Sequence, residues 1–208
     1  LIYLGALTEN AIRRAIQSLT DRNTDMAKSV IASDYEIDKM DKEIEEKCIK
    51  LLALRQPTAI DLRFITTSIK ITGHLERIGD MAVNIAEKVV QLNEEPKLKP
   101  YIDLPHMSSI VEKMVTKSLD AMIKRDLQLA EEVRQIEQEV DDLNEQIFRE
   151  LLTFMMEDSK SIHRALLIMH VSKNLERMAD HAQGIADMVT YMITGENVRH
   201  LSKEANER

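Results

Sequence analysis

Two short acidic segments of this sequence repeat each other, and their carboxylates are spaced to lie on one face of a helix. Residues 75–80 read LERIGD and residues 175–180 read LERMAD, at an offset of 100 residues. Each places a glutamate four residues before an aspartate, Glu76 before Asp80 and Glu176 before Asp180, and such residues share a helix face. Carboxylates grouped in this way can bind hard cations such as Mg²⁺, or iron and manganese through oxygen ligands.

A second acidic stripe precedes the first segment by about forty residues. On a helical wheel its members lie within about 40° of one another and border the apolar face; they are Asp34, Asp38, Asp41 and Glu45. Like charges one turn apart repel by roughly 0.2–0.5 kcal/mol per pair, so the column requires compensation, which a cation would supply.

A plainer interpretation of the repeated acids also stands. Arg77 and Asp80 have the i,i+3 spacing of a surface ion pair, as do Arg177 and Asp180, and such pairs are common on solvated helix faces. Spacing alone does not decide between a cation site and a polar surface.

The repeat extends over most of the chain. Aligning Asp38 with Asp141 gives a register of 103 residues, so the first half carries three extra residues between its acidic motifs. We expect them in the turn at residues 54–57, where insertions are tolerated. The predicted organisation is a first half at 1–95, a linker at 96–104, a second half at 105–195 and a polar tail at 196–208.

Composition and periodicity predict an all-α protein. The 208 residues include only 5 glycines and 4 prolines, which favours long helices. One predicted helix has the apolar stripe Val30, Ile37, Met40, Ile44, Cys48 and Leu51. We predict helices at 2–20, 24–54, 58–93, 106–124, 126–156 and 160–194. Short turns between long helices make antiparallel neighbours, so each half should be an antiparallel three-helix bundle.

Charge and cysteine usage exclude several classes of partner. The net charge of −8, without a basic cluster, argues against nucleic-acid binding. The longest apolar run, residues 165–169, is far shorter than the ~20 residues of a membrane-spanning helix. Cys48 has no disulfide partner and fits the core of a cytoplasmic protein. Leu1 already lies within a helical pattern, so we expect the first helix to begin before it.

The acidic motifs, taken together, resemble the PhoU family of phosphate-signalling proteins. The matching residues are Asp34-x-x-x-Asp38, the LERIGDMAVNIAE segment that begins at Leu75, and the turn Gln56-Pro57-x-Ala59-x-Asp61-Leu62-Arg63. The second half repeats the pattern at Glu137-x-x-x-Asp141 and at residues 175–182, but it has no counterpart of the Gln-Pro turn. The resemblance covers nearly the whole chain.

This resemblance implies six helices in two three-helix bundles, each with acidic motifs that bind metal ions, in some relatives as iron clusters. Carried over residue by residue, the metal ligands of the first half would be Asp34, Asp38, Glu76, Asp80 and Glu87. Those of the second half would be Glu137, Asp141, Glu176, Asp180 and Asp187. Asn144 and Gly184 stand where the first half has Asp41 and Asn84, so we expect the second site to be the poorer in oxygen ligands. The metal could be iron, Mg, Mn or Zn.

The resemblance further implies a non-enzymatic, negative regulator of phosphate-starvation signalling and phosphate uptake. Its expected partners are the ATPase subunit of a phosphate ABC transporter and a sensor histidine kinase, which would hold it at the cytoplasmic face of the membrane. A homodimer is also considered. Two alternatives remain: a metal-dependent hydrolase or oxidase that uses the acids, and a purely structural helical adaptor.

Other site chemistries lack support in the sequence. There is no Glu-x-x-His spacing for a ferritin-like di-iron centre and no glycine-rich phosphate loop. His74, His163, His170 and His181 do not recur between the halves, so they are interpreted as helix-surface or boundary residues.

Overall fold

The computed structural model describes residues 1–196 and contains six α-helices with one 3₁₀ turn. The helices are α1 (Ile2–Thr20), α2 (Thr24–Arg55), α3 (Ala59–Asn93), α4 (Asp103–Lys124), α5 (Leu127–Glu157) and α6 (Ile162–Thr194), and the 3₁₀ turn η1 spans Ser159–Ser161. No strand occurs among these residues, so the predicted all-α class is confirmed. Most of the predicted polar tail, residues 197–208, lies outside the described part.

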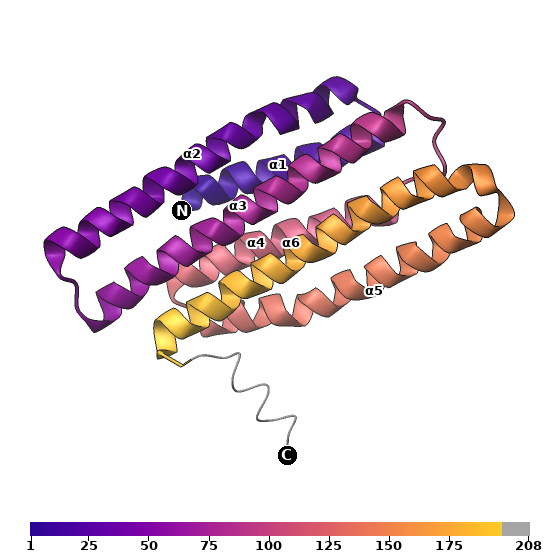
Figure 1. Ribbon diagram of the computed structural model, residues 1–208. Coiled ribbons are helices and arrows are strands. Elements are labelled where there is room, and N and C mark those ends of the chain that lie inside the picture. The colour runs from indigo at the N-terminus through magenta and orange to yellow at the C-terminus, as the bar shows by residue number, and fades with distance from the viewer. Residues whose placement is uncertain (197–208) are drawn as a thin grey trace, which may run out of the picture.

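The helices form two antiparallel three-helix bundles that lie side by side (Figure 1). Helices α1–α3 pack on one another, as do α4–α6, and the bundles meet where α3 packs against α6 and α1 against α4. Helices α2 and α5 therefore lie on opposite outer sides (Figure 1). The buried apolar side chains of both bundles belong to one contiguous core.

The repeat is visible in how the first helix of each bundle ends. Arg22 and Arg125, which are 103 residues apart, both adopt a left-handed conformation with φ of 51°. The residue after each caps the next helix: the Asn23 side chain accepts from the Met26 amide, and Asp126 accepts from the amides of residues 128 and 129. Such caps satisfy amides that have no intrahelical partner. The same turn chemistry is thus used twice.

One predicted boundary is wrong. Helix α4 begins at Asp103 and not at residue 106, because Pro105 lies in its first turn, where proline is tolerated. The turn between α2 and α3 spans three residues, 56–58, whereas Asp158 alone separates α5 from η1, which runs directly into α6. Most of the extra length of the first half therefore lies close to the expected 54–57 turn.

The apolar stripe of α2 is only partly buried. Val30, Ile37 and Cys48 are in the core, as predicted. Leu51 is 46% exposed, so its assignment to the buried stripe is wrong. The amino terminus of α1 lies close to Lys47 and Cys48, and Leu51 lies beyond that level of the bundle.

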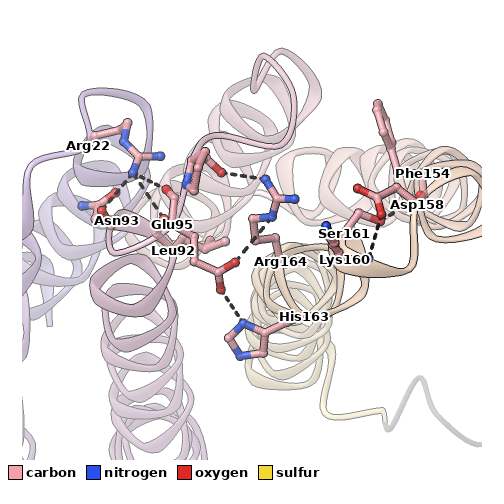
Figure 2. A network of polar contacts seen from close by, with 11 residues as sticks. Arg22, Leu92, Asn93, Glu95, Phe154, Asp158, Lys160, Ser161, His163 and Arg164 are labelled. Atoms are coloured by element: carbon pink, nitrogen blue, oxygen red, sulfur yellow. Dashed lines mark hydrogen bonds and ion pairs between the residues drawn. The ribbon is translucent and has the colours of Figure 1, made fainter.

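The chain between the bundles is held by side chains from both of them (Figure 2). From the first bundle, Arg22 donates to the carbonyl oxygens of Asn93 at 2.9 Å and Glu95 at 2.6 Å. The Asn93 carbonyl is at the end of α3 and lacks an intrahelical partner, and Glu95 lies just beyond the helix. The partly buried Arg22 side chain therefore closes the carboxyl end of α3 and binds the chain that leaves it.

From the second bundle, two consecutive residues of α6 hold the same segment. Arg164 donates to the Pro96 carbonyl at 3.0 Å, and His163 Nδ1 lies 2.6 Å from a Glu95 carboxylate oxygen (Figure 2). The chain that enters the predicted linker is thus a fixed connection, because Arg22 of the first bundle binds the residues just before it and Arg164 of the second binds its first residue, Pro96.

Within residues 1–196 no helix combines the length and the apolar character that are needed to cross a bilayer.

Two helical glycines give opposite predictions for substitution by alanine. A Cβ on Gly73 of α3 would meet nothing within 4 Å, whereas a Cβ on Gly184 of α6 would lie 2.6 Å from His74 Cε1. We expect Gly73→Ala to raise the free energy of unfolding by about 1 kcal/mol through helix propensity. Gly184→Ala should lower it by about 1–2 kcal/mol, because the His74 ring must move. Urea denaturation measures both changes, and equal stabilisation by the two substitutions would contradict the α3–α6 packing.

Candidate functional site

Three aspartates from two helices converge in the first bundle. Asp34 and Asp38 of α2 and Asp80 of α3 each offer a carboxylate oxygen, and these oxygens all lie within 4.8 Å of one another. All three residues are partly buried. The two acidic stripes therefore face each other across the α2–α3 contact, which spacing alone could not decide.

A glycine allows α2 to approach α3 at this point. Gly79 immediately precedes Asp80 and is buried, and a Cβ built on it would lie 3.0 Å from Ile37 Cδ1 and 3.7 Å from an Asp34 carboxylate oxygen. Ile37 is itself in the core, between the two aspartates of α2. A larger residue at position 79 would push α2 outward, so the glycine helps to bring the acids within reach of one another.

The surroundings of the carboxylates in the first bundle destabilise their anionic forms. Burial raises the pKa of Asp34, and the neighbouring Asp38 and Asp80 raise it further. Burial also raises the pKa of Glu76, as do the negative charges of Asp80 and Asp38. One Asp34 oxygen, Oδ1, is buried without a hydrogen-bond partner. A buried acceptor in this state favours a proton or a cation nearby.

The surface ion pair between Arg77 and Asp80 is present, but its distance is long. Arg77 lies 3.7 Å from an Asp80 oxygen and 3.5 Å from a Glu76 oxygen, and its side chain is 64% exposed. Exposed pairs of this kind contribute roughly 0–1 kcal/mol. Arg77 therefore compensates only part of the charge that the acids bring together.

The second bundle contains the equivalent acids with a different balance of charge. Burial raises the pKa of Glu137, and Asp141, Asp180 and Glu176 raise it further, so these four acids are neighbours. Lys173 donates to one oxygen of Glu176 at 2.6 Å, while the other oxygen, Oε2, is buried and unpaired. Gly73 occupies the position of Lys173 in the first bundle. The second site thus has a lysine that the first site lacks, whereas the first site has only the long contacts of Arg77.

The last acid of each predicted set lies away from these clusters. Glu87 is exposed two turns beyond Asp80. Asp187 is bound by Arg134 of α5, whose Nη2 lies 2.8 Å and whose Nε lies 2.9 Å from the same carboxylate oxygen. Asp187 therefore joins α5 to α6 through an ion pair.

Comparison with known proteins supports the resemblance seen in these motifs. The family model described as the PhoU domain matches residues 1–89 and again residues 104–189, one copy per bundle. This chain belongs to the PhoU family.

Relatives and solved structures agree over nearly the full length. Proteins named phosphate-specific transport system accessory protein PhoU homolog are 40% identical in Pseudomonas aeruginosa and 42% identical in Aquifex aeolicus. The matches cover 97% and 96% of this chain and 84% and 90% of those proteins. The crystal structure of PhoU from Pseudomonas aeruginosa has a TM-score of 0.89 at 39% identity, covering 94% of both chains. PhoU from Streptococcus pneumoniae, described as a phosphate transport system regulatory protein, has a TM-score of 0.86 at 29% identity, covering 93% and 91%.

The PhoU fold also brings together residues that the sequence did not assign to a site. His74 of α3 and His181 of α6 form a contact between the bundles, with their Nδ1 atoms 3.0 Å apart and the rings edge to face. Lys173 and Arg134 supply cations to the acids of the second bundle. The spacing of Lys173 before Glu176, which is i,i+3, was the one signal available in the sequence.

The raised pKa of Asp34 predicts how pH acts on the metal-free protein. Its folded state binds a proton more tightly than the unfolded state, so this group adds to the free energy of unfolding as pH falls through the raised pKa toward about 3.9. In the presence of a metal chelator, Asp34→Asn should be more stable than wild type at about pH 7, because a repelling charge is removed. That advantage should shrink toward about pH 4. Urea denaturation across this range measures the difference, and a constant advantage would contradict the convergence of the acids.

Proposed function

We propose that this protein is the accessory regulator of a phosphate-specific transport system. The observation that carries the proposal is the match, over nearly the whole chain, to relatives that are named as accessory proteins of such a system. In finer terms, the protein would dampen phosphate-starvation signalling by coupling a phosphate ABC transporter to a sensor histidine kinase. Contact with these partners would hold it at the cytoplasmic face of the membrane.

Metal binding is the second part of the proposal, and the acids of the first bundle fit a metal ion. Asp34, Asp38 and Asp80 offer three oxygens within 4.8 Å of one another, and one Asp34 oxygen is a buried acceptor without a partner. The donor set contains only carboxylates, which favours Mg²⁺, Mn²⁺ or iron bound through oxygen over metals that need thiolates. A bound cation would neutralise the acids and link α2 to α3. The proposal covers a single ion as well as an iron cluster, and it includes Zn among the candidate metals.

The second bundle would hold metal less tightly. Lys173 already neutralises part of the charge on Glu176, and Asn144 stands in place of Asp41, with its amide oxygen accepting from the Ser172 hydroxyl at 2.6 Å. Glu137, Asp141, Glu176 and Asp180 would be its ligands.

Two other functions differ from this proposal in what they require. A metal-dependent hydrolase or oxidase would use the same acids to turn over a substrate, so steady phosphoester hydrolysis by the metal-loaded protein would favour it. A purely structural adaptor would bind its partners equally well without metal. Family membership favours an accessory role over catalysis.

Replacing one aspartate should remove most of the stabilisation that metal gives. In the presence of a metal chelator, Asp80→Asn should melt at a higher temperature than wild type, because the mutual repulsion of the acids is reduced. With metal at a hundredfold excess over Kd, wild type should gain about 2.7 kcal/mol, and the variant should lose most of that gain. Thermal melts with and without metal, together with metal analysis of the purified proteins, provide the measurement.

Glu87→Gln is the matched control, since Glu87 is an exposed acid on the same helix. It should melt and bind metal as wild type does under both conditions, because Glu87 lies two turns beyond Asp80. Equal stabilisation by metal in wild type and in Asp80→Asn would refute the site in the first bundle.

The regulatory part predicts physical association with membrane proteins. We expect the protein to co-purify from membranes of phosphate-replete cells with the transporter ATPase or with the cytoplasmic part of the kinase. Light scattering on the purified protein would show whether it also forms a homodimer. Recovery of neither partner under phosphate-replete conditions would overturn the regulatory assignment, whatever the metal content.

A further inference from the structure

A polar pocket lies between α3 and α6, where the two bundles meet. Its volume is about 280 Å³, just below the usual range for drug-sized ligands, which suits a small ligand. Only one of its lining residues is apolar. The lining residues are Arg77, Asp80, Met81, Asn84, Arg177 and His181.

The repeat explains why two arginines face this one pocket. Helices α3 and α6 run antiparallel, since Arg63 contacts Met192 and His74 contacts His181. In such an antiparallel pair, residues 100 apart lie opposite each other at only one level along the helices. Arg77 and Arg177 are at that level. Duplicated residues elsewhere on the two helices lie far apart, as in any two-fold contact.

The protein neutralises the two guanidinium groups only in part. Arg77 has only the long contacts to Glu76 and Asp80. Among the residues that the structure describes, Arg177 has no carboxylate within 4.0 Å. Burial lowers the pKa of His181, and both Arg177 and Arg77 lower it further, so both positive charges act on the pocket. An anion would relieve their repulsion.

We propose that this pocket binds a small phosphate-type oxyanion. Two guanidinium groups can each donate a pair of parallel hydrogen bonds to an oxyanion, which suits phosphate better than a point charge would. The Asn84 amide adds further donors. Arg177 has no competing role in the acid clusters, because it forms no ion pair with their carboxylates.

Asp80 gives the pocket a means of choosing between oxyanions. Near neutral pH inorganic phosphate still carries at least one hydroxyl proton, whereas sulfate carries none. The Asp80 carboxylate can accept a hydrogen bond from phosphate, but toward sulfate it presents only repulsion. The pocket should therefore prefer phosphate.

The inference rests on the pocket alone and not on the proposed role in phosphate transport. Calorimetric titration of the full chain with inorganic phosphate, at fixed ionic strength and metal content, tests it. Wild type should bind, and Arg177→Met should bind at least about tenfold more weakly, through loss of charge-assisted hydrogen bonds. Arg177→Lys should lie between them, because lysine keeps the charge without the planar fork.

Arg149→Met is the matched control, because Arg149 is an exposed arginine of α5 that pairs with Glu145 one turn away. It should bind phosphate as wild type does. Absence of phosphate binding by wild type, or equal loss in Arg149→Met and Arg177→Met, would overturn the proposal. Sulfate binding as tight as phosphate would overturn the role of Asp80. Partner co-purification should stay unchanged in Arg177→Met, as should metal content measured without phosphate, so failure here is distinct from failure of the proposed function.

Discussion

The packing of α3 against α6 is the contact on which the rest of the structure depends. Both helices bury residues along nearly their whole length, from Ile65 to Leu92 in α3 and from Ala165 to Met192 in α6. This contact joins the two cores into one. It also fixes the rotation of both helices, so that the repeated arginines face the shared pocket while the repeated acids face the outer helices α2 and α5. The repeated segment thus contributes its arginine to one surface of each helix and its acids to another.

The outer helices are attached by far less apolar surface, so charge matters more for them. Helix α2 buries four of its 32 residues and α5 five of its 31, whereas α3 buries fourteen of 35. In the second bundle, Arg134 and Asp187 link α5 to α6. Within residues 1–196, no ion pair joins α2 to α3, and Ile31 occupies the position equivalent to Arg134. The first bundle therefore lacks a cation equivalent to Arg134, and only the exposed Arg77 offsets part of the charge of its carboxylates, which is the physical case for metal there.

Much of the fold could be predicted from the sequence because it depends on local signals. The turns that end at Asn23 and Asp126, the helical periodicity and the repeat are all properties of short segments or of their comparison. The convergence of Asp34 with Asp80 could not be predicted, because it depends on the rotation of α2 and on the absence of a side chain at Gly79. Likewise, Asp187 has the same place in its motif as Glu87, yet its partner Arg134 comes from another helix. Repetition of an acid therefore does not guarantee repetition of its role.

Asp80 belongs both to the acid cluster and to the pocket between the bundles, which makes the two sites electrostatically dependent on each other. With its full negative charge, Asp80 attracts Arg77 and opposes an anion in the pocket. A cation shared with Asp34 and Asp38 would withdraw part of that charge and leave the two arginines more strongly positive toward an oxyanion. Linkage makes the effect reciprocal, so an oxyanion in the pocket would favour the cation by the same factor. The asymmetry between the bundles then has a consequence: only the acid cluster of the first bundle contributes an aspartate to the pocket lining, so that bundle is the one through which metal and oxyanion would be coupled.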